Sequence, residues 1–171
     1  MNNRTLEDHC LKGGNMTYQV YKAIDVADAL VRLALADKKP LINLKVQKLT
    51  YLVYGCWLGF ANFQMFQDRV EAWKYGPVIP VLYNQLARYG ANFIQEPILE
   101  KNPIPKDSEE YQLIHDIYNE FKDLKAWQLV YLTHQKGSPW HQTHTPETKG
   151  SIISPDLVRD YYKNLLSDPH D

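Results

Sequence analysis

The stretch NLKVQKLTYLVYGCWLGF, residues 43–60, constrains how the rest of this chain folds. Its apolar residues follow the i, i+3, i+4 spacing of one helix face, and large apolar residues also occupy the opposite side. The first face carries Leu49, Leu52, Val53, Cys56, Trp57 and Phe60, and the other carries Tyr51, Tyr54 and Leu58. We predict a helix that begins near Asn43, as its N-cap, runs towards Phe63, and is buried almost all round. Gly55 and Gly59 lie four residues apart, so we expect a neighbouring element to approach closely along that line.

A second stretch, EAWKYGPVIPVLY at residues 71–83, predicts a strand, a turn and the start of a helix. Its strand is expected over residues 69–73, with the dipeptide Gly76-Pro77 turning the chain and Pro80 in the first turn of the helix. An extended piece at residues 92–96 is expected to pair with this strand. One Trp and two Tyr in such a connection indicate that it is packed or used for recognition.

The remaining pattern is helical. A helix is expected from Thr17, as a cap, to about Lys38, with Pro40 ending it. Later helices are expected after Pro80 up to Gly90, after a capping box at Asp107 and Glu110, at residues 125–134, and from Ser154-Pro155. The sequence thus predicts a mainly α fold, a single compact helical domain with a buried central helix and a small β element near residues 69–75 and 92–96.

The domain is expected to cover residues 17–166, between an N-terminal tail of residues 1–16 and a C-terminal tail of residues 167–171. The pattern changes abruptly at Met16, so translation from Met16 rather than Met1 is a further hypothesis.

Composition narrows the function classes. The chain of 171 residues has 19 Lys and Arg against 20 Asp and Glu, which removes the broad positive field that drives nucleic-acid binding. Its two cysteines, Cys10 and Cys56, are too few for a disulfide framework. The longest apolar run, around residues 49–63, is shorter than the ~20 residues of a membrane helix. These features predict a cytoplasmic protein without a membrane partner.

Motifs for catalysis are weak. His134, His141 and His144 invite a zinc hypothesis, but their spacing matches no standard ligand motif. We therefore predict no metal and no cofactor, and expect His134 to close a hydrogen bond at a helix end while Trp140 fills the core. Glu71 is the best single candidate for an acid or base. A metal-dependent enzyme using residues 134–144 stays the alternative to a protein without enzymatic activity.

Three motifs in this order, NLKVQKLTYLVYGCWLGF, EAWKYGPVIPVLY and LTHQKGSPW, resemble the Panacea antitoxin domain family, which includes SocA-like antitoxins and GepA-like phage-associated proteins. The resemblance covers about residues 18–165. It implies a mainly helical domain that neutralises a cognate toxin by direct binding, with the toxin often encoded by the adjacent gene on mobile elements such as prophages. In the SocA branch it also implies a proteolytic adaptor that delivers the toxin to the ClpXP protease.

The resemblance also implies which residues matter. The family pattern falls on Leu44, Lys45, Gln47, Lys48, Leu49 and Tyr51, then on Glu71, Trp73, Tyr75, Gly76, Pro77 and Tyr83, and finally on His134, Pro139 and Trp140. We expect partner contacts from Lys45, Lys48, Tyr51, Glu71, Lys74 and Tyr75, and a structural role for the others.

Departures from the family pattern at Val46, Thr50 and residues 53–54 leave the choice of partner open. The chain lacks the extra DNA-binding domain of some relatives, so direct nucleic-acid binding is not expected. A phage protein that binds a host factor is a further alternative.

Overall fold

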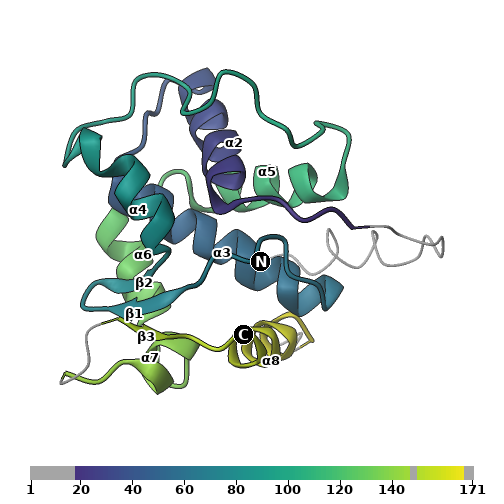
Figure 1. Ribbon diagram of the computed structural model, residues 1–171, viewed down its shortest axis with the longest axis vertical. Helices are drawn as coiled ribbons and strands as arrows, with labels where there is room; N and C mark the ends of the chain where they lie inside the picture. The colour runs from purple at the N-terminus through teal and green to yellow at the C-terminus, as the bar shows by residue number, and fades with distance from the viewer. Residues whose placement is uncertain (1–17, 147–149, 168–171) are drawn as a thin grey trace.

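Helix α3 (Asn43–Ala61) runs through the middle of the molecule, and most other elements pack on it (Figure 1). The computed structural model describes residues 18–146 and 150–167. In Figure 1, α2 (Ala23–Ala36) and α5 (Glu109–Phe121) lie above α3, and α8 (Pro155–Ser167) lies below it. The mainly helical architecture predicted from the sequence is confirmed.

Helix α3 is buried on nearly all sides. Every residue from Lys45 to Leu58 is buried, which confirms the prediction drawn from its two apolar faces. Each large side chain buried in this way contributes about 1.5 to 3 kcal/mol to stability. The predicted start was one residue late, because Ile42 is the N-cap and Asn43 is the first helical residue. Its end at Ala61 falls two residues short of the predicted Phe63.

The two glycines of α3 form the contact surface for α8, as predicted. A Cβ atom at Gly55 would lie 2.3 Å from the ring of Tyr162, and one at Gly59 would lie 2.7 Å from the backbone nitrogen of Lys163. Real Cβ atoms do not approach other atoms so closely, so glycine at both positions allows the helices to pack at this distance.

A small antiparallel sheet has the strand order β2-β1-β3. Its strands are β1 (Glu71–Trp73), β2 (Gly76–Val78) and β3 (Ser151–Ile152). The turn is formed by residues 74–75, so Gly76-Pro77 begins β2 instead of turning the chain.

The predicted pairing of residues 92–96 with this sheet is wrong. Strand β3 occupies the edge of β1 that β2 leaves open. Phe93 instead pairs with Ile42, and the N–H of Ile94 donates to the carbonyl of Leu41 at 2.8 Å, just before α3. The extended piece therefore exists but joins a different part of the chain.

Several helix boundaries differ from the predictions. Helix α2 starts at Ala23 and ends at Ala36, where Lys38 adopts a positive φ of 56°, so it stops before Pro40 is reached. The expected cap at Thr17 lies outside the described residues. Helix α5 is capped by Ser108, whose hydroxyl accepts from the N–H of Tyr111, instead of by Asp107.

The other helices follow the sequence pattern. Pro80 is the first residue of α4 (Pro80–Leu86), which continues as the 3-10 helix η1 (Ala87–Tyr89) and ends at Gly90. Helices α6 (Ala126–Thr133) and α7 (Pro139–Thr143) flank the break at Gly137. Pro155 begins α8 as predicted.

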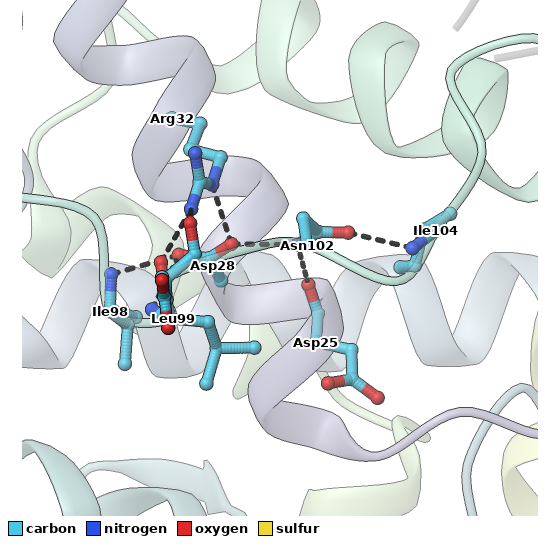
Figure 2. Close-up of polar contacts among 8 residues, drawn as sticks. Asp25, Asp28, Arg32, Ile98, Leu99, Asn102 and Ile104 are labelled. Carbon is cyan, nitrogen blue, oxygen red and sulfur yellow. Dashed lines mark hydrogen bonds and ion pairs between the residues drawn. The ribbon is translucent and has the colours of Figure 1, made fainter.

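A long loop between η1 and α5 is fixed to α2 by Asp28. This carboxylate is fully buried, and Figure 2 shows it directed at the loop. It accepts from the N–H groups of Ile98 and Leu99 at 2.8 and 3.0 Å, from the amide of Asn102 at 2.8 Å, and from Arg32 Nε at 2.7 Å. A buried charge is tolerated only when it is paired and hydrogen-bonded, and Asp28 meets both conditions.

Candidate functional site

The structure brings the three sequence motifs together around the β1–β2 hairpin. Helix α3 contributes Gln47 and Lys48, the end of α6 contributes Thr133 and His134, and α7 contributes Trp140. In Figure 1 the hairpin lies at one end of α3, beside α6 and α4. The motifs are therefore separate in sequence but form one cluster.

Strand β2 is held by side chains of α3. It is an edge strand, and backbone groups that lack a strand partner need another one. Lys48 Nζ donates to the carbonyl of Pro77 at 2.7 Å, and Gln47 Oε1 accepts from the N–H of Ile79 at 3.0 Å. The two motif residues of α3 thus bind the backbone of β2 and of the residue that follows it.

Lys48 is fully buried in this cluster. Burial disfavours its ammonium form and lowers the pKa of Lys48 to about 7. Gly76 lies beside it with a φ of 96°, and a Cβ there would lie 2.8 Å from Thr133 Oγ1 and 3.1 Å from Lys48 Nζ. Glycine is required at this position both for its backbone conformation and for space.

Helix α7 is fixed to the other strand, β1. Trp140 Nε1 donates to the carbonyl of Trp73 at 2.8 Å, and Trp73 Nε1 donates to Glu71 Oε2 at 2.8 Å. Glu71 also pairs with Arg69 at 2.8 Å. Glu71 thus lies within a network of structural contacts.

His134 stacks on Trp140, with ring centroids 3.5 Å apart. Its backbone N–H donates to the carbonyl of Val130 at 3.1 Å and closes the end of α6. Its side-chain Nε2 is buried and has no hydrogen-bond partner in the described part of the chain. Burial, followed by the charges of Lys48 and His144, lowers the pKa of His134 to about 4, so the ring is neutral at neutral pH.

Four of the six expected partner-binding residues are buried, so their side chains are not accessible to a partner in this structure. Lys45, Lys48, Tyr51 and Glu71 are at most 9% exposed. Lys45 Nζ donates to the carbonyl of Leu124 at 2.6 Å, so this lysine links α3 to the start of α6. Periodicity does not reveal such contacts, because a long lysine side chain can reach a backbone carbonyl far away in sequence.

The other two expected partner-binding residues, Lys74 and Tyr75, form the exposed tip of the hairpin. Tyr75 is 61% exposed, and Lys74 Nζ lies 5.4 Å from the centroid of its ring. Tyr83 of α4 packs beside the hairpin, with its ring centroid 5.1 Å from that of Trp73. An exposed tip on a fixed base is a suitable site for recognition.

The remaining motif residues have structural positions. Leu49 is fully buried in the core, Leu44 is half-buried on α3, and Pro139 is the first residue of α7. Sequence reasoning missed Thr133, which is buried against Gly76, and Asp28, which fixes the long loop. The apolar run AIDVADALV contains two acids, Asp25 and Asp28, and an acid within such a run was a signal that could have identified Asp28.

Residues 18–146 and 150–167 contain no group of three or more His, Cys, Asp or Glu side chains arranged to hold a metal ion. The three histidines of the zinc hypothesis do not form one, and His144 stacks on Trp140 at a centroid distance of 4.5 Å. Over the same residues, no helix has the length and apolar character needed to cross a membrane.

Burial of Lys48 predicts a pH-dependent stability. Between pH 7 and the ordinary lysine pKa of 10.5, the unfolded state binds a proton that the folded state has lost, so stability rises with pH. The slope is at most about 1.4 kcal/mol per pH unit for one proton. Lys48→Met should reduce this slope between about pH 7 and 8.5, measured by urea denaturation.

The exposed Lys106→Met variant is the control and should keep the slope of the natural chain. Above about pH 9 the buried thiol of Cys56, whose pKa burial raises to about 12, acts in the opposite direction. An unchanged slope in Lys48→Met below that pH would contradict the assignment of the slope to Lys48.

The sequence that forms the hairpin cluster matches a known class of antitoxin domain. Residues 46–141 match the family model described as "Antitoxin SocA-like, Panacea domain", which covers more than half of the chain, and the chain belongs to this family. The chain is also 31% identical over 124 residues to Antitoxin SocA of Caulobacter vibrioides (strain NA1000 / CB15N). That alignment covers 67% of this chain and 66% of the relative, just under two thirds of its length. No solved structure gives a significant match.

Proposed function

We propose that this protein is an antitoxin that neutralises a cognate toxin by direct protein–protein binding. Its membership of the SocA-like Panacea family carries the proposal, because the matched residues 46–141 include the whole hairpin cluster. Neutralisation of this kind needs binding alone, without a catalytic step or a cofactor. The toxin is proposed to be the product of the adjacent gene.

The geometry of the hairpin supports a binding role. Lys48 and Gln47 of α3 bind the backbone of Pro77 in β2 and of Ile79 directly after it, and Trp140 of α7 binds the backbone of Trp73 in β1. The tip, Lys74 and Tyr75, is thereby presented on a fixed base. Fixing a binding loop in advance lowers the entropic cost of association, and Tyr is among the residues that contribute most at interfaces.

Co-expression with the adjacent gene tests the proposal. The natural chain is expected to restore the growth of cells that express this gene. Tyr75→Ala should weaken rescue, since loss of a central aromatic contact commonly lowers affinity by about tenfold or more. Leu165→Ala, at a side chain 54% exposed on α8, is the matched control and should rescue fully.

Circular dichroism must show that both variants are folded. Failure of the natural chain to restore growth against a toxic neighbour would contradict the proposed function. Full rescue by folded Tyr75→Ala would exclude only the hairpin tip from the binding site.

The proposal includes a second step, in which the antitoxin delivers the bound toxin to the ClpXP protease. The family resemblance supports this step. A shorter toxin half-life in the presence of the antitoxin, seen only in cells that contain ClpX, is the expected result. An equal half-life in cells with and without ClpX would restrict the function to neutralisation by binding.

A further inference from the structure

Two segments of the chain carry no carboxylate. Residues 72–95 and 124–146 contain no Asp or Glu, although the chain has 20 of these residues. Their Lys and Arg residues, all exposed, are Lys74, Arg88, Lys125 and Lys136. Among the described residues, none of these four cations forms an ion pair with a carboxylate. The two segments therefore carry unneutralised positive charge on a chain whose net charge is −1.

Exposed apolar side chains concentrate on the same segments. Ten large apolar side chains are exposed in the described residues, and seven belong to these segments. The first segment contributes Tyr75, Val81, Tyr83 and Phe93. The second contributes Trp127, Tyr131 and Leu132 from α6, and the first two of these are 64% and 70% exposed. Single exposed apolar residues are common, whereas a contiguous patch of them marks an interaction surface, so the positions of the two segments relative to each other matter.

Contacts at both ends of α6 join the two segments. At the end of the helix, Thr133 Oγ1 lies 2.8 Å from the position of a Cβ on Gly76, the residue after Tyr75. Before the start of α6, the carbonyl of Leu124 accepts a hydrogen bond from Lys45 Nζ. Lys45 is three residues after Ile42, and Ile42 pairs with Phe93 of the first segment. Figure 1 shows α6, β2 and α4 at the same end of α3. We call the exposed side chains of residues 72–95 and 124–146 the carboxylate-free surface.

We propose that the carboxylate-free surface binds an acidic surface of a partner protein, with Trp127 and Tyr131 as the apolar anchors. These two aromatic residues are four positions apart on α6 and so lie on one face of the helix. The four exposed cations of the surface complement acidic groups of the partner and increase the association rate. This inference rests on the proposed function, in which the partner is the toxin.

The charge pattern favours a protein over a nucleic acid. Aromatic and cationic residues also occur together in sites that bind single-stranded nucleic acid. In those sites the bases stack on the aromatic rings and a positively charged groove follows the nucleic-acid backbone. Here four cations are spread over two segments, and the chain as a whole is slightly negative. Nucleic acid is therefore the competing outcome in the first experiment below.

The first experiment tests the chemistry of the surface without the toxin. The full chain is titrated with a random glutamate–tyrosine copolymer, with a lysine–tyrosine copolymer and with oligo(dT). Only the glutamate–tyrosine copolymer is expected to bind. The double variant Trp127→Ala/Tyr131→Ala and the charge reversal Lys125→Glu/Lys136→Glu should each weaken its binding by about tenfold or more.

Matched controls lie outside the surface. Ile152→Ala changes a side chain that is 60% exposed on β3, and Lys106→Glu reverses an exposed charge on the long loop. Both should bind like the natural chain. Absence of copolymer binding, or equal binding by all variants, would overturn the proposal. Tighter binding of oligo(dT) that requires Trp127 and Tyr131 would reassign the surface to nucleic acid.

The second experiment is rescue by co-expression with the adjacent gene. Rescue by the natural chain and its loss in folded Trp127→Ala/Tyr131→Ala would support the surface as the toxin-binding site. Rescue by both would overturn the inference while the proposed function stands. If the natural chain does not rescue, the proposed function fails, and the copolymer titration alone decides whether the surface binds acidic protein.

Discussion

Asp28→Ala is expected to destabilise the protein by about 2 to 4 kcal/mol, because removing this buried acceptor leaves several hydrogen-bond donors without a partner, at about 1 to 3 kcal/mol for each donor that stays buried. Asp28 is fully buried and accepts hydrogen bonds from Arg32, from two backbone N–H groups and from Asn102. The variant leaves Arg32 without its carboxylate and the N–H groups of Ile98 and Leu99 without their acceptor. Urea denaturation measures the loss, and faster hydrogen exchange at Ile98 and Leu99 would show that the loop is released.

Asp160→Ala is the control for this prediction. Asp160 also pairs with an arginine, Arg159, at 2.9 Å, but its side chain is exposed. A surface pair of this kind contributes about 0 to 1 kcal/mol. If both aspartate variants lose the same small amount of stability, the role assigned to Asp28 is wrong.

Gly59→Ala is the second variant with a large expected effect, a loss of about 1 to 3 kcal/mol from overpacking. Alanine favours a helix by about 1 kcal/mol over glycine, so a purely local effect would stabilise the protein. The added Cβ would lie 2.7 Å from the nitrogen of Lys163 and 2.8 Å from the carbonyl carbon of Tyr162. Since these are backbone atoms, α8 has to move away as a whole.

Gly55→Ala provides the comparison, because its Cβ would meet the ring of Tyr162 and not the backbone. Tyr162→Leu should therefore restore part of the stability that Gly55→Ala loses. It should not restore the stability that Gly59→Ala loses. Double-mutant cycles measure both effects. Lys163→Ala, at an exposed position of α8, should change stability little. A Gly59→Ala variant as stable as the natural chain would contradict the close packing of α3 and α8.

Helical periodicity predicted the centre of the fold because burial follows directly from the apolar pattern. Both faces of residues 43–60 are apolar, and the spacing of Gly55 and Gly59 indicates the close approach of a neighbouring element, which is α8. Pro80 and Gly90 likewise placed α4 and its end. Local chemistry determines such features, so the sequence displays them.

Long-range pairing could not be predicted in the same way. Residues 92–96 have a strand-like pattern. Nothing local shows that Phe93 pairs with Ile42, just before α3, and that these residues do not pair with β1. Strand β3 has only two residues, Ser151 and Ile152, which is too short for an alternating pattern to be recognised. The choice between competing partners for a strand edge depends on the whole packing arrangement.

The sequence identified the motifs around the hairpin but not which of their residues are exposed. The three motifs do meet around the hairpin, but the side chains of Lys45 and Lys48 are buried and donate hydrogen bonds to backbone carbonyls. The exposed aromatic residues of α6, Trp127 and Tyr131, were missed because aromatic residues in a helical pattern more often belong to the core. The absence of carboxylates from residues 124–146 is visible in the sequence and was the available signal.

Direct binding to the product of the adjacent gene is the measurement that tests the antitoxin proposal most directly. Isothermal titration calorimetry of the full chain with this purified product should give saturable binding, with a dissociation constant of about 1 µM or lower. The Trp127→Ala/Tyr131→Ala variant should bind more weakly under the same conditions, while Ile152→Ala should not. The absence of binding between the natural chain and a folded, toxic product of that gene would contradict neutralisation by direct contact.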